Sequence, residues 1–272
     1  MEKEVALVYM VAGMSSRFGG EVKQFARVGP NDETLIEYSL KQALDVGFSK
    51  IIFIVGNRTE VKFREMFGDE YIGVPVFYAR QGFDFETRNR PWGTVDALCC
   101  VKELIDCSFV VCNGDDIYGK SSFEILFNHV QKSEESATIG FKLGNMLSDS
   151  CDVNRGIFEV NRDGYIESMV EMFAVNRQNL VEKNLDVDDL CNVNLFAFHP
   201  SVLEMLDVKL KSFKERNDGD RDAECLLSTE LSKLVESRLM KIKTYFASGK
   251  YMGVTGPEDV EIVRKTILSQ SD

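Results

Sequence analysis

The sequence predicts an α/β fold in which helices cover both faces of a mostly parallel sheet. Runs that are apolar at nearly every position recur in the first half of the chain, at 5–11, 50–55, 74–79 and 109–112. Segments with helical spacing of apolar residues separate these runs. Strands that are apolar on both faces and alternate with helices are typical of a parallel sheet that is buried on both sides.

The helices of the first half have recognisable starts and ends. Thr34 followed by Glu37 has the spacing of a capping box, which predicts a helix that starts there and ends at Gly47. Further helices are predicted at 60–67 and 94–105. Each of the three helices follows an apolar run, as the connections between parallel strands require.

After about residue 120 the pattern becomes mixed. Short strands now alternate less regularly with helices, which indicates a β-rich second half. The expected elements are a helix at 123–132, a strand at 137–142, a hairpin of 156–160 and 165–170, a strand at 193–198, a helix at 225–235, a strand at 241–246 and a helix opening at Pro257. The polar runs 186–189 and 215–222 are interpreted as solvated loops. With 272 residues and no low-complexity linker, a single domain is expected.

Charge and composition exclude several functional classes. The chain has 32 basic and 44 acidic residues, a net charge of −12, which argues against nucleic acid as a partner. Any bound phosphate must therefore find a local basic pocket. No apolar run approaches the roughly 20 residues that span a bilayer, so no membrane partner is expected. The seven cysteines lie mostly in apolar runs without metal or redox spacing, which favours free thiols and a cytoplasmic location.

The loop after the first strand is rich in small residues and carries positive charge. Ala12 and Gly13 allow a ligand to approach the backbone, and Arg17 and Lys23 bring two cations to the same segment. The loop lacks the GxGxxG spacing, so a dinucleotide site is disfavoured. On these residues alone, a phosphate site and a flexible turn with solvated cations remain equal alternatives.

The loop after the third strand offers groups that suit a nucleobase. The Gln81 amide can donate and accept hydrogen bonds, and Gly93 lets a flat ring lie against the backbone. The alternative is a surface glutamine beside a turn whose Thr94 caps the next helix, and on these residues alone this alternative is favoured.

The loop after the fourth strand contains two adjacent carboxylates, Asp115 and Asp116. Carboxylates at a strand end are oxygen ligands suited to Mg2+, although the same residues also favour a simple turn. Residues 114–121 also match the GxxxxGK[ST] pattern of a P-loop with Lys120 as its lysine. We reject that interpretation because two carboxylates in such a loop would repel phosphate.

Together the loops AGMSSRFGGEVKQ, Gln81 with PWGTVDA, and NGDDIYG resemble the nucleotidyltransferase family, which includes the sugar-1-phosphate nucleotidylyltransferases or NDP-sugar pyrophosphorylases. The resemblance continues at 28–40, 155–160 with Glu171, 192–198 and 252–260, and so covers most of the chain. It implies a Rossmann-like, mostly parallel mixed sheet with a smaller β-rich acceptor-binding part in the C-terminal half. Residues 1–120 would form the nucleotide-binding half and 121–272 the acceptor-binding half.

The resemblance also implies roles for individual residues. Arg17, Lys23 and Asp115 would be catalytic, and Asp115 would hold Mg2+. The nucleotide would be bound by Ala12, Gly13, Arg17, Gln81, Gly93 and Thr94. The acceptor would be bound by Lys23, Gly156, Glu171, Asn192 and Asn194. Two positions depart from the family pattern: Ser15 replaces a usual glycine, and Gly253 stands where many sugar-specific members carry a second metal-binding aspartate.

The expected reaction is Mg2+-dependent transfer of a nucleoside monophosphate from a nucleoside triphosphate to a phosphorylated acceptor, a sugar 1-phosphate, with release of pyrophosphate. The base is expected to be a pyrimidine, because one amide and a close backbone suit a compact edge. The acceptor phosphate is already anionic and needs no general base. Two alternatives remain: a P-loop NTPase or kinase that uses Lys120, and a non-catalytic nucleotide-binding regulatory module. A homo-oligomer is possible.

Overall fold

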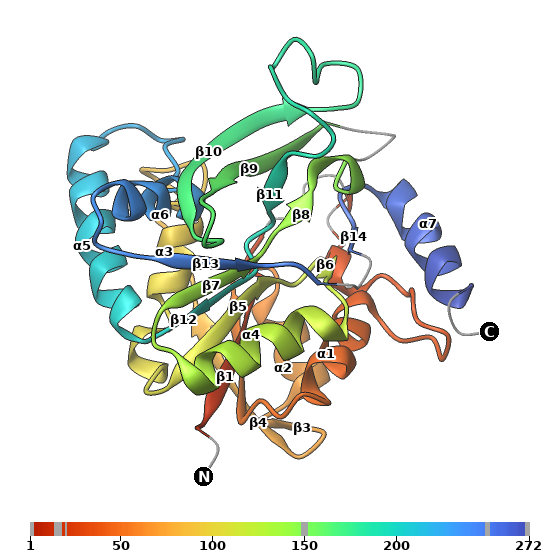
Figure 1. The fold of residues 1–272 in the computed structure, drawn as a ribbon. Coiled ribbons are helices and arrows are strands. Elements are labelled where there is room, and N and C mark those ends of the chain that lie inside the picture. The colour runs from red at the N-terminus through yellow and green to blue at the C-terminus, as the bar shows by residue number, and fades with distance from the viewer. Residues whose placement is uncertain (1–2, 14–17, 20, 148–151, 248–250, 270–272) are drawn as a thin grey trace.

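Figure 1 shows the protein as a computed structural model that describes residues 3–13, 18–19, 21–147, 152–247 and 251–269. Within these ranges eight strands form the main sheet: β1 (Val5–Met10), β2 (Lys50–Val55), β3 (Glu70–Tyr71), β4 (Val74–Arg80), β5 (Ser108–Asn113), β7 (Ser136–Ile139), β12 (Phe196–Phe198) and β13 (Ile242–Tyr245). Their spatial order is β13-β7-β12-β5-β1-β2-β4-β3. Only β12 and β3 run antiparallel to their neighbours, so the mostly parallel mixed sheet is confirmed.

Helices cover both faces of this sheet, as expected. One face carries α1 (Leu35–Leu44), α2 (Glu60–Phe67) and α4 (Lys120–Lys132), and the other carries α3 (Thr94–Cys99), α5 (Ser201–Arg216) and α6 (Leu227–Glu236). The strands supply both cores by alternation. In β1, Leu7 packs toward α1 and its neighbours, while Val8 packs toward α3 and its neighbours. Burial on both faces explains why these strands are apolar at nearly every position.

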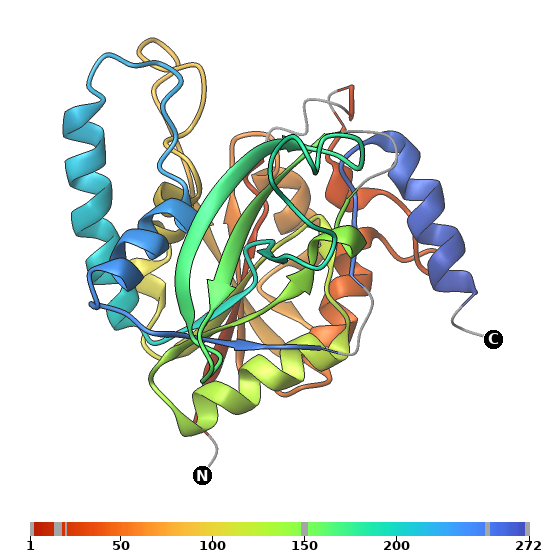
Figure 2. The same ribbon diagram turned by 45° about the horizontal axis from the view of Figure 1, so that its top comes forward.

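A second sheet lies beside the first. It consists of β8 (Phe141–Lys142), β9 (Val153–Val160), β10 (Ile166–Val175) and β11 (Leu190–Asn192), in the order β10-β9-β11-β8. The β9–β10 hairpin lies between α6 on one side and α7 (Pro257–Leu268) on the other (Figure 2). A two-stranded sheet pairs β6 (Asp116–Ile117) with β14 (Met252–Gly253), next to α7. The expected β-rich part of the C-terminal half is therefore present.

One predicted strand is divided between the two sheets, and another is shorter than predicted. The segment expected at 137–142 bends at Gly140, so that β7 belongs to the main sheet and β8 to the second. The segment expected at 193–198 is a strand only at 196–198, because the chain crosses from β11 to β12 at 193–195, where Asn194 has φ of 59°. Because β7 pairs with β12 and β8 with β11, the two segments cross side by side as one ribbon.

Other departures concern helices and short turns. Helix α5 was not predicted, although Val202, Leu203, Leu206 and Leu210 are buried at helical spacing. The helix expected at 94–105 ends at Cys99 and is followed by a short 3-10 turn, η3 (Lys102–Leu104). Two more such turns are η2 (Lys23–Phe25) and η4 (Leu143–Asn145). The other predicted helices and strands are present, with ends shifted by a few residues.

Candidate active site

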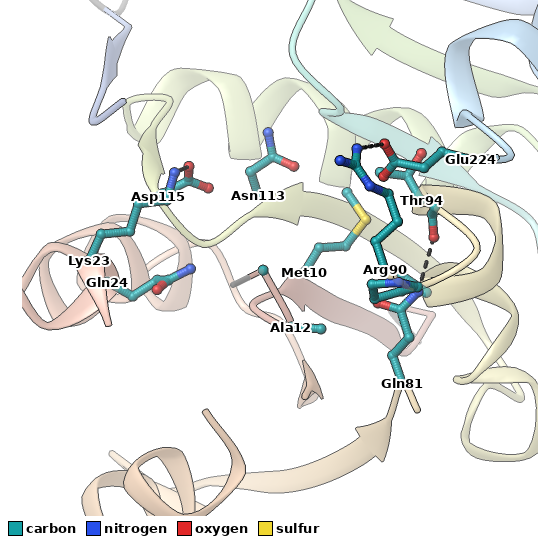
Figure 3. A pocket seen from close by; sticks show the side chains of 14 residues that line it. Met10, Ala12, Lys23, Gln24, Gln81, Arg90, Thr94, Asn113, Asp115 and Glu224 are labelled. Atoms are coloured by element: carbon teal, nitrogen blue, oxygen red, sulfur yellow. Dashed lines mark hydrogen bonds and ion pairs between the residues drawn. The ribbon is translucent and has the colours of Figure 1, made fainter. Parts of the chain in front are cut away.

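The carboxyl ends of β1, β4 and β5 meet at one edge of the main sheet, where their loops line a cavity of about 460 Å³. Figure 3 shows this cavity from close by. Seven of the predicted site residues line it: Ala12, Gly13, Lys23, Gln81, Gly93, Thr94 and Asp115. Arg17 and Ser15 lie outside the described residues. The loops singled out in the sequence therefore converge on one site, as strand ends in an open parallel sheet do.

One end of the cavity carries two opposite charges. Lys23 lies on η2, and its Nζ forms an ion pair with Asp115 Oδ2 in the loop after β5. The Lys23 ammonium also donates to the Val254 carbonyl at 3.3 Å. The two side chains remain 19% and 23% exposed, so both can be reached by a ligand in the cavity. A charged ligand could exchange with either partner.

The second carboxylate of this loop has a different position. Asp116 is buried and accepts hydrogen bonds from the Asn113 amide at 2.8 Å, the Tyr118 hydroxyl at 3.1 Å and the Tyr251 hydroxyl at 2.6 Å. Burial, together with the nearby charge of Asp115, raises the pKa of the Asp116 carboxyl. Asp116 therefore fixes the loop, while Asp115 faces the cavity.

The P-loop pattern has no structural counterpart. Lys120 begins α4 and lies on the surface, 3.3 Å from the Asp45 carboxylate. Asp116 and Ile117 pair as a strand with β14 rather than enclosing an anion. Lys120 is not among the described residues that line the cavity, which removes the basis for the P-loop alternative.

At the other end of the cavity the Gln81 amide is held by the protein. Its Nε2 donates to the Gly93 carbonyl at 3.0 Å and to Asp96 Oδ2 at 2.9 Å. Lys214 Nζ lies 2.6 Å from the other oxygen of Asp96. Both amide hydrogens of Gln81 are therefore engaged by the protein, while contact of Gln81 with a base stays a prediction.

The two residues after Pro91 and Trp92 differ from their sequence interpretation. Gly93 has φ of 96°, and a Cβ there would lie 2.6 Å from the Cys225 carbonyl oxygen. Glycine is therefore required by this close approach as well as by the backbone conformation. Gly93, not Thr94, is the N-cap of α3. The Thr94 hydroxyl instead accepts from the Leu227 N–H at 2.8 Å at the start of α6.

Sequence reasoning missed the residues that close this end of the cavity. Arg90 and Glu224 both line it and form an ion pair of 2.8 Å (Figure 3). Arg88 stacks on Trp92, 3.4 Å from the ring centroid, and donates to the carbonyls of the loop after α5. The helical spacing at 202–210 was the available signal for α5, but nothing local shows that the loop after α5 reaches the cavity.

The residues expected to bind the acceptor lie mainly on the second sheet. Glu171 and Asn192 face Gly156 from the strands on either side of it. The Glu171 carboxylate accepts from the Ser228 hydroxyl of α6, and burial raises the pKa of this carboxyl. None of these residues, nor Asn194, is among the described residues that line the 460 Å³ cavity. The Asn194 amide contacts Asn113 Oδ1 at 3.3 Å, which connects this group to the cavity wall.

The Asn192 side chain also holds the chain crossing. It is buried, donates to the Thr138 hydroxyl at 2.6 Å and accepts from the Asn194 N–H at 2.5 Å. These bonds stabilise the left-handed conformation of Asn194 between β11 and β12. Asn192 therefore has a structural function, whereas its contact with an acceptor stays a prediction.

Comparison with known proteins places this geometry in a family. The model of the family described as "Nucleotidyl transferase" matches residues 21–236. The chain belongs to the nucleotidyl transferase family. UTP–glucose-1-phosphate uridylyltransferase AglF of Haloferax volcanii is 26% identical over 64% of this chain and 68% of its own length.

Solved structures show the same fold over nearly the whole chain. A UDP-glucose pyrophosphorylase complexed with UDP-glucose has a TM-score of 0.69 and 17% identity over 98% of this chain and 99% of its own. The inositol-1-phosphate CTP transferase from T. maritima has a TM-score of 0.69 and 15% identity over 98% of this chain and 97% of its own. A putative glucose-1-phosphate thymidylyltransferase from Bacillus anthracis has a TM-score of 0.70 and 12% identity over 97% of this chain and 95% of its own.

The departure at Gly253 has a local cause in this family member. Gly253 pairs with Asp116 across the two-stranded sheet. A Cβ at this position would lie 2.9 Å from Asp116 Oδ1 and closer still to the Tyr251 hydroxyl. The hydrogen bond between Tyr251 and Asp116 therefore occupies the space into which a side chain at 253 would project.

The donor set for a cation in this nucleotidyl transferase is small. No three His, Cys, Asp or Glu side chains in the described part of the chain come together as a metal cluster. Asp115 still offers a hard, accessible carboxylate, and Mg2+ commonly takes only one or two protein carboxylates beside phosphate oxygens and water. The residues present thus fit a cation that a substrate helps to hold. Among the described helices, none has the length and apolar character to cross a membrane.

Proposed function

We propose that this nucleotidyl transferase moves a nucleoside monophosphate from a nucleoside triphosphate to a sugar 1-phosphate and releases pyrophosphate. The observation that carries the proposal is the pairing of Lys23 with Asp115 at one end of a cavity whose other end presents Gln81. Membership of the family and the similarity to a uridylyltransferase support it.

The nucleotide is proposed to lie along the cavity. Its base would rest beside Gln81 and Gly93, and its phosphates would pass Ala12 and Gly13 toward Lys23. Ala12 lies between these two ends in Figure 3, which is consistent with that path. Arg17 is proposed as a further phosphate ligand from the sequence alone. A pyrimidine base remains the preferred assignment.

The acceptor is proposed to enter from the second sheet. Gly156, Glu171 and Asn194 border that route, and Asn113 joins it to the cavity. Lys23 would meet the acceptor phosphate by exchanging its ion pair with Asp115 for one with the incoming anion. Because that phosphate is already negative, the side chains need only position it and offset its charge.

Asp115 is proposed to hold Mg2+ together with phosphate oxygens of the substrate. When bound, the ion supplies positive charge that stabilises the developing pyrophosphate. The contribution of the protein is a fixed carboxylate: Asp115 O accepts from Val254 N at 3.1 Å, and the neighbouring Asp116 is held by three side chains. A cytoplasmic location and a homo-oligomer stay predictions.

The test is pyrophosphate release from UTP, dTTP, CTP, ATP and GTP, each with a panel of sugar 1-phosphates and a Mg2+ titration. We expect release that depends on both substrates and on Mg2+, with UTP or dTTP preferred. Release of inorganic phosphate instead would favour an NTPase. Tight nucleotide binding without turnover on any acceptor would favour a regulatory module. Purine nucleotides that bind as tightly as pyrimidines would contradict the base assignment.

A further inference from the structure

We propose that Asp96 and Lys214 are positioning residues that fix the orientation of the Gln81 amide, so that the site selects uracil or thymine over cytosine. This inference rests on the proposed function, because it concerns the nucleotide of that reaction. The inference adds two residues to the proposed contact of Gln81 with a base. Asp96 and Lys214 are not among the described residues that line the cavity.

Both hydrogens of the Gln81 amide are already used. Nε2 donates one to the Gly93 carbonyl at 3.0 Å and the other to Asp96 Oδ2 at 2.9 Å. A primary amide has two N–H donors, so none remains for a ligand. No described residue donates to Gln81 Oε1, and Gln81 lines the cavity. Toward a base, Gln81 is therefore an acceptor only.

The partners of the Gln81 amide oppose its reversal. Reversal would turn Oε1 toward the Gly93 carbonyl and the Asp96 carboxylate, which are both acceptors without a hydrogen to give. Gln81 and Asp96 are both buried, at 7% and 8% exposure, so water cannot readily bridge the resulting repulsion. The Gly93 carbonyl and the Asp96 carboxylate thus determine the orientation of the Gln81 amide.

Lys214 gives Asp96 a charged partner. Its Nζ lies 2.6 Å from Asp96 Oδ1, while Gln81 occupies Oδ2, so each oxygen of the carboxylate has its own donor. Lys214 comes from α5, whose Phe213 packs edge-on against Trp92 in the same loop as Gly93. Helix α5 thereby provides the charge that the buried carboxylate needs.

An acceptor without a neighbouring donor, such as Gln81 Oε1, distinguishes uracil and thymine from cytosine. Uracil and thymine carry a hydrogen on ring N3, which can donate to Oε1. Cytosine has a lone pair at N3, which would face the lone pairs of Oε1 in the same pose. A site that leaves such polar atoms unpaired discriminates strongly against the poorer ligand. We therefore expect UTP and dTTP to be used and CTP to be rejected.

The decisive variant is Asp96→Asn. An asparagine amide can donate to Gln81 Oε1, so only the Gly93 carbonyl still opposes reversal. The reversed glutamine, which offers a hydrogen to cytosine N3, should then be populated more often. We expect the ratio of kcat/KM for UTP to that for CTP to fall at least about tenfold, with CTP use rising, while the KM for the sugar 1-phosphate stays unchanged. The control is Lys211→Met, which changes a lysine of the same helix that pairs with Asp207 at the surface.

Two further variants keep the test decisive if Asp96→Asn folds poorly. Lys214→Met should lower the UTP to CTP ratio by a smaller factor, about threefold, and Lys214→Arg should restore it. Calorimetric titration of wild type and variants with UDP and CDP measures the same selectivity without turnover. A wild-type protein that binds CDP as tightly as UDP overturns the inference, as does an unchanged ratio in folded Asp96→Asn. Selective UDP binding without pyrophosphate release would instead refute the proposed function alone.

Discussion

The two ends of the cavity are built on different principles. At one end Lys23 and Asp115 satisfy each other, and both remain accessible. At the other end Gln81 donates hydrogen bonds to Gly93 and Asp96, and Asp96 also pairs with Lys214. Gln81 and Asp96 are buried. We expect the charged end to exchange partners when substrate binds, whereas the amide end should keep its bonds. Recognition of the base can therefore be preorganised, while the reacting groups stay free to rearrange.

The strongest challenge to this contrast is Asp115→Asn. It removes the negative charge proposed to hold Mg2+, so we expect activity to fall by about a thousandfold or more. Base selectivity, measured as the UDP to CDP binding ratio, should not change, because the amide end is untouched. Lys120→Ala is the matched control and should be nearly silent, since Lys120 pairs with Asp45 at the surface. An inactive Lys120→Ala beside an active Asp115→Asn would restore the P-loop alternative.

Lys23→Ala should produce the next largest effect. Loss of a charged contact to phosphate costs about 1.5 to 3 kcal/mol, so turnover or acceptor affinity should drop roughly 10- to 150-fold. Steady-state kinetics with each substrate varied separately distinguishes Lys23 from Arg17, because Arg17→Ala should weaken triphosphate binding instead. Equal effects of Lys23→Ala on the KM of both substrates would contradict an acceptor role. A fall in Tm as large as that of a core truncation would show that the residue is structural.

Glu171→Gln tests whether the second sheet takes part. Replacing the carboxylate weakens a hydrogen-bond acceptor beside the proposed acceptor route, so the KM for the sugar 1-phosphate should rise about tenfold. UTP binding should remain as in wild type. Glu167→Gln, on the same strand with an exposed side chain, is the control. Equal kinetics for the two variants would move the acceptor site away from Glu171.

The smallest effect is expected at Gly253. Gly253→Ala forces a methyl group against Tyr251 and Asp116, which should lower the free energy of unfolding by about 1 to 3 kcal/mol. Gly82→Ala is the control, because a Cβ there meets nothing within 4 Å. Thermal or urea unfolding measures both variants. Nucleotide selectivity should survive the substitution. A fully stable Gly253→Ala would show that the space at this position is available for a second ligand.

The sequence predicted the parts of the site that depend on local patterns. Strands such as 50–55 are buried on both faces and therefore largely apolar, and the loop that carries Asp115 follows such a strand. The loop that carries Gln81 follows β4, which is largely apolar although Phe77 is exposed. More distant contacts at the site could not be predicted, because Lys214 pairs with Asp96, and Glu224 with Arg90, from more than 100 residues away along the chain. The need for glycine at 93 has the same origin, since the backbone of Cys225 fills the space beside it.

Division of one apolar run between two sheets was equally hidden. Residues 137–142 were predicted as one strand, because a short apolar run is the same whether it stays in one sheet or bends into another. Residues 193–198 were also predicted as one strand, although 193–195 form the crossing that leads into β12. The bend at Gly140 and the crossing at Asn194 become visible only when the pairing of the strands on either side of them is known. Asp116 illustrates a related limit, since adjacent carboxylates have no sequence signal that tells which one is buried.

The ribbon that crosses between the sheets also has a mechanical consequence. Two paired segments leave the main sheet together and enter the second sheet as neighbours. A single connection would act as a swivel, whereas two hydrogen-bonded connections restrict rotation about their axis and leave bending as the easier motion. Because Asn192 also donates a hydrogen bond to Thr138 of the main sheet, we expect the distance between the two sheets at this crossing to change little. Any closure of the second sheet toward the cavity should follow that one bending direction.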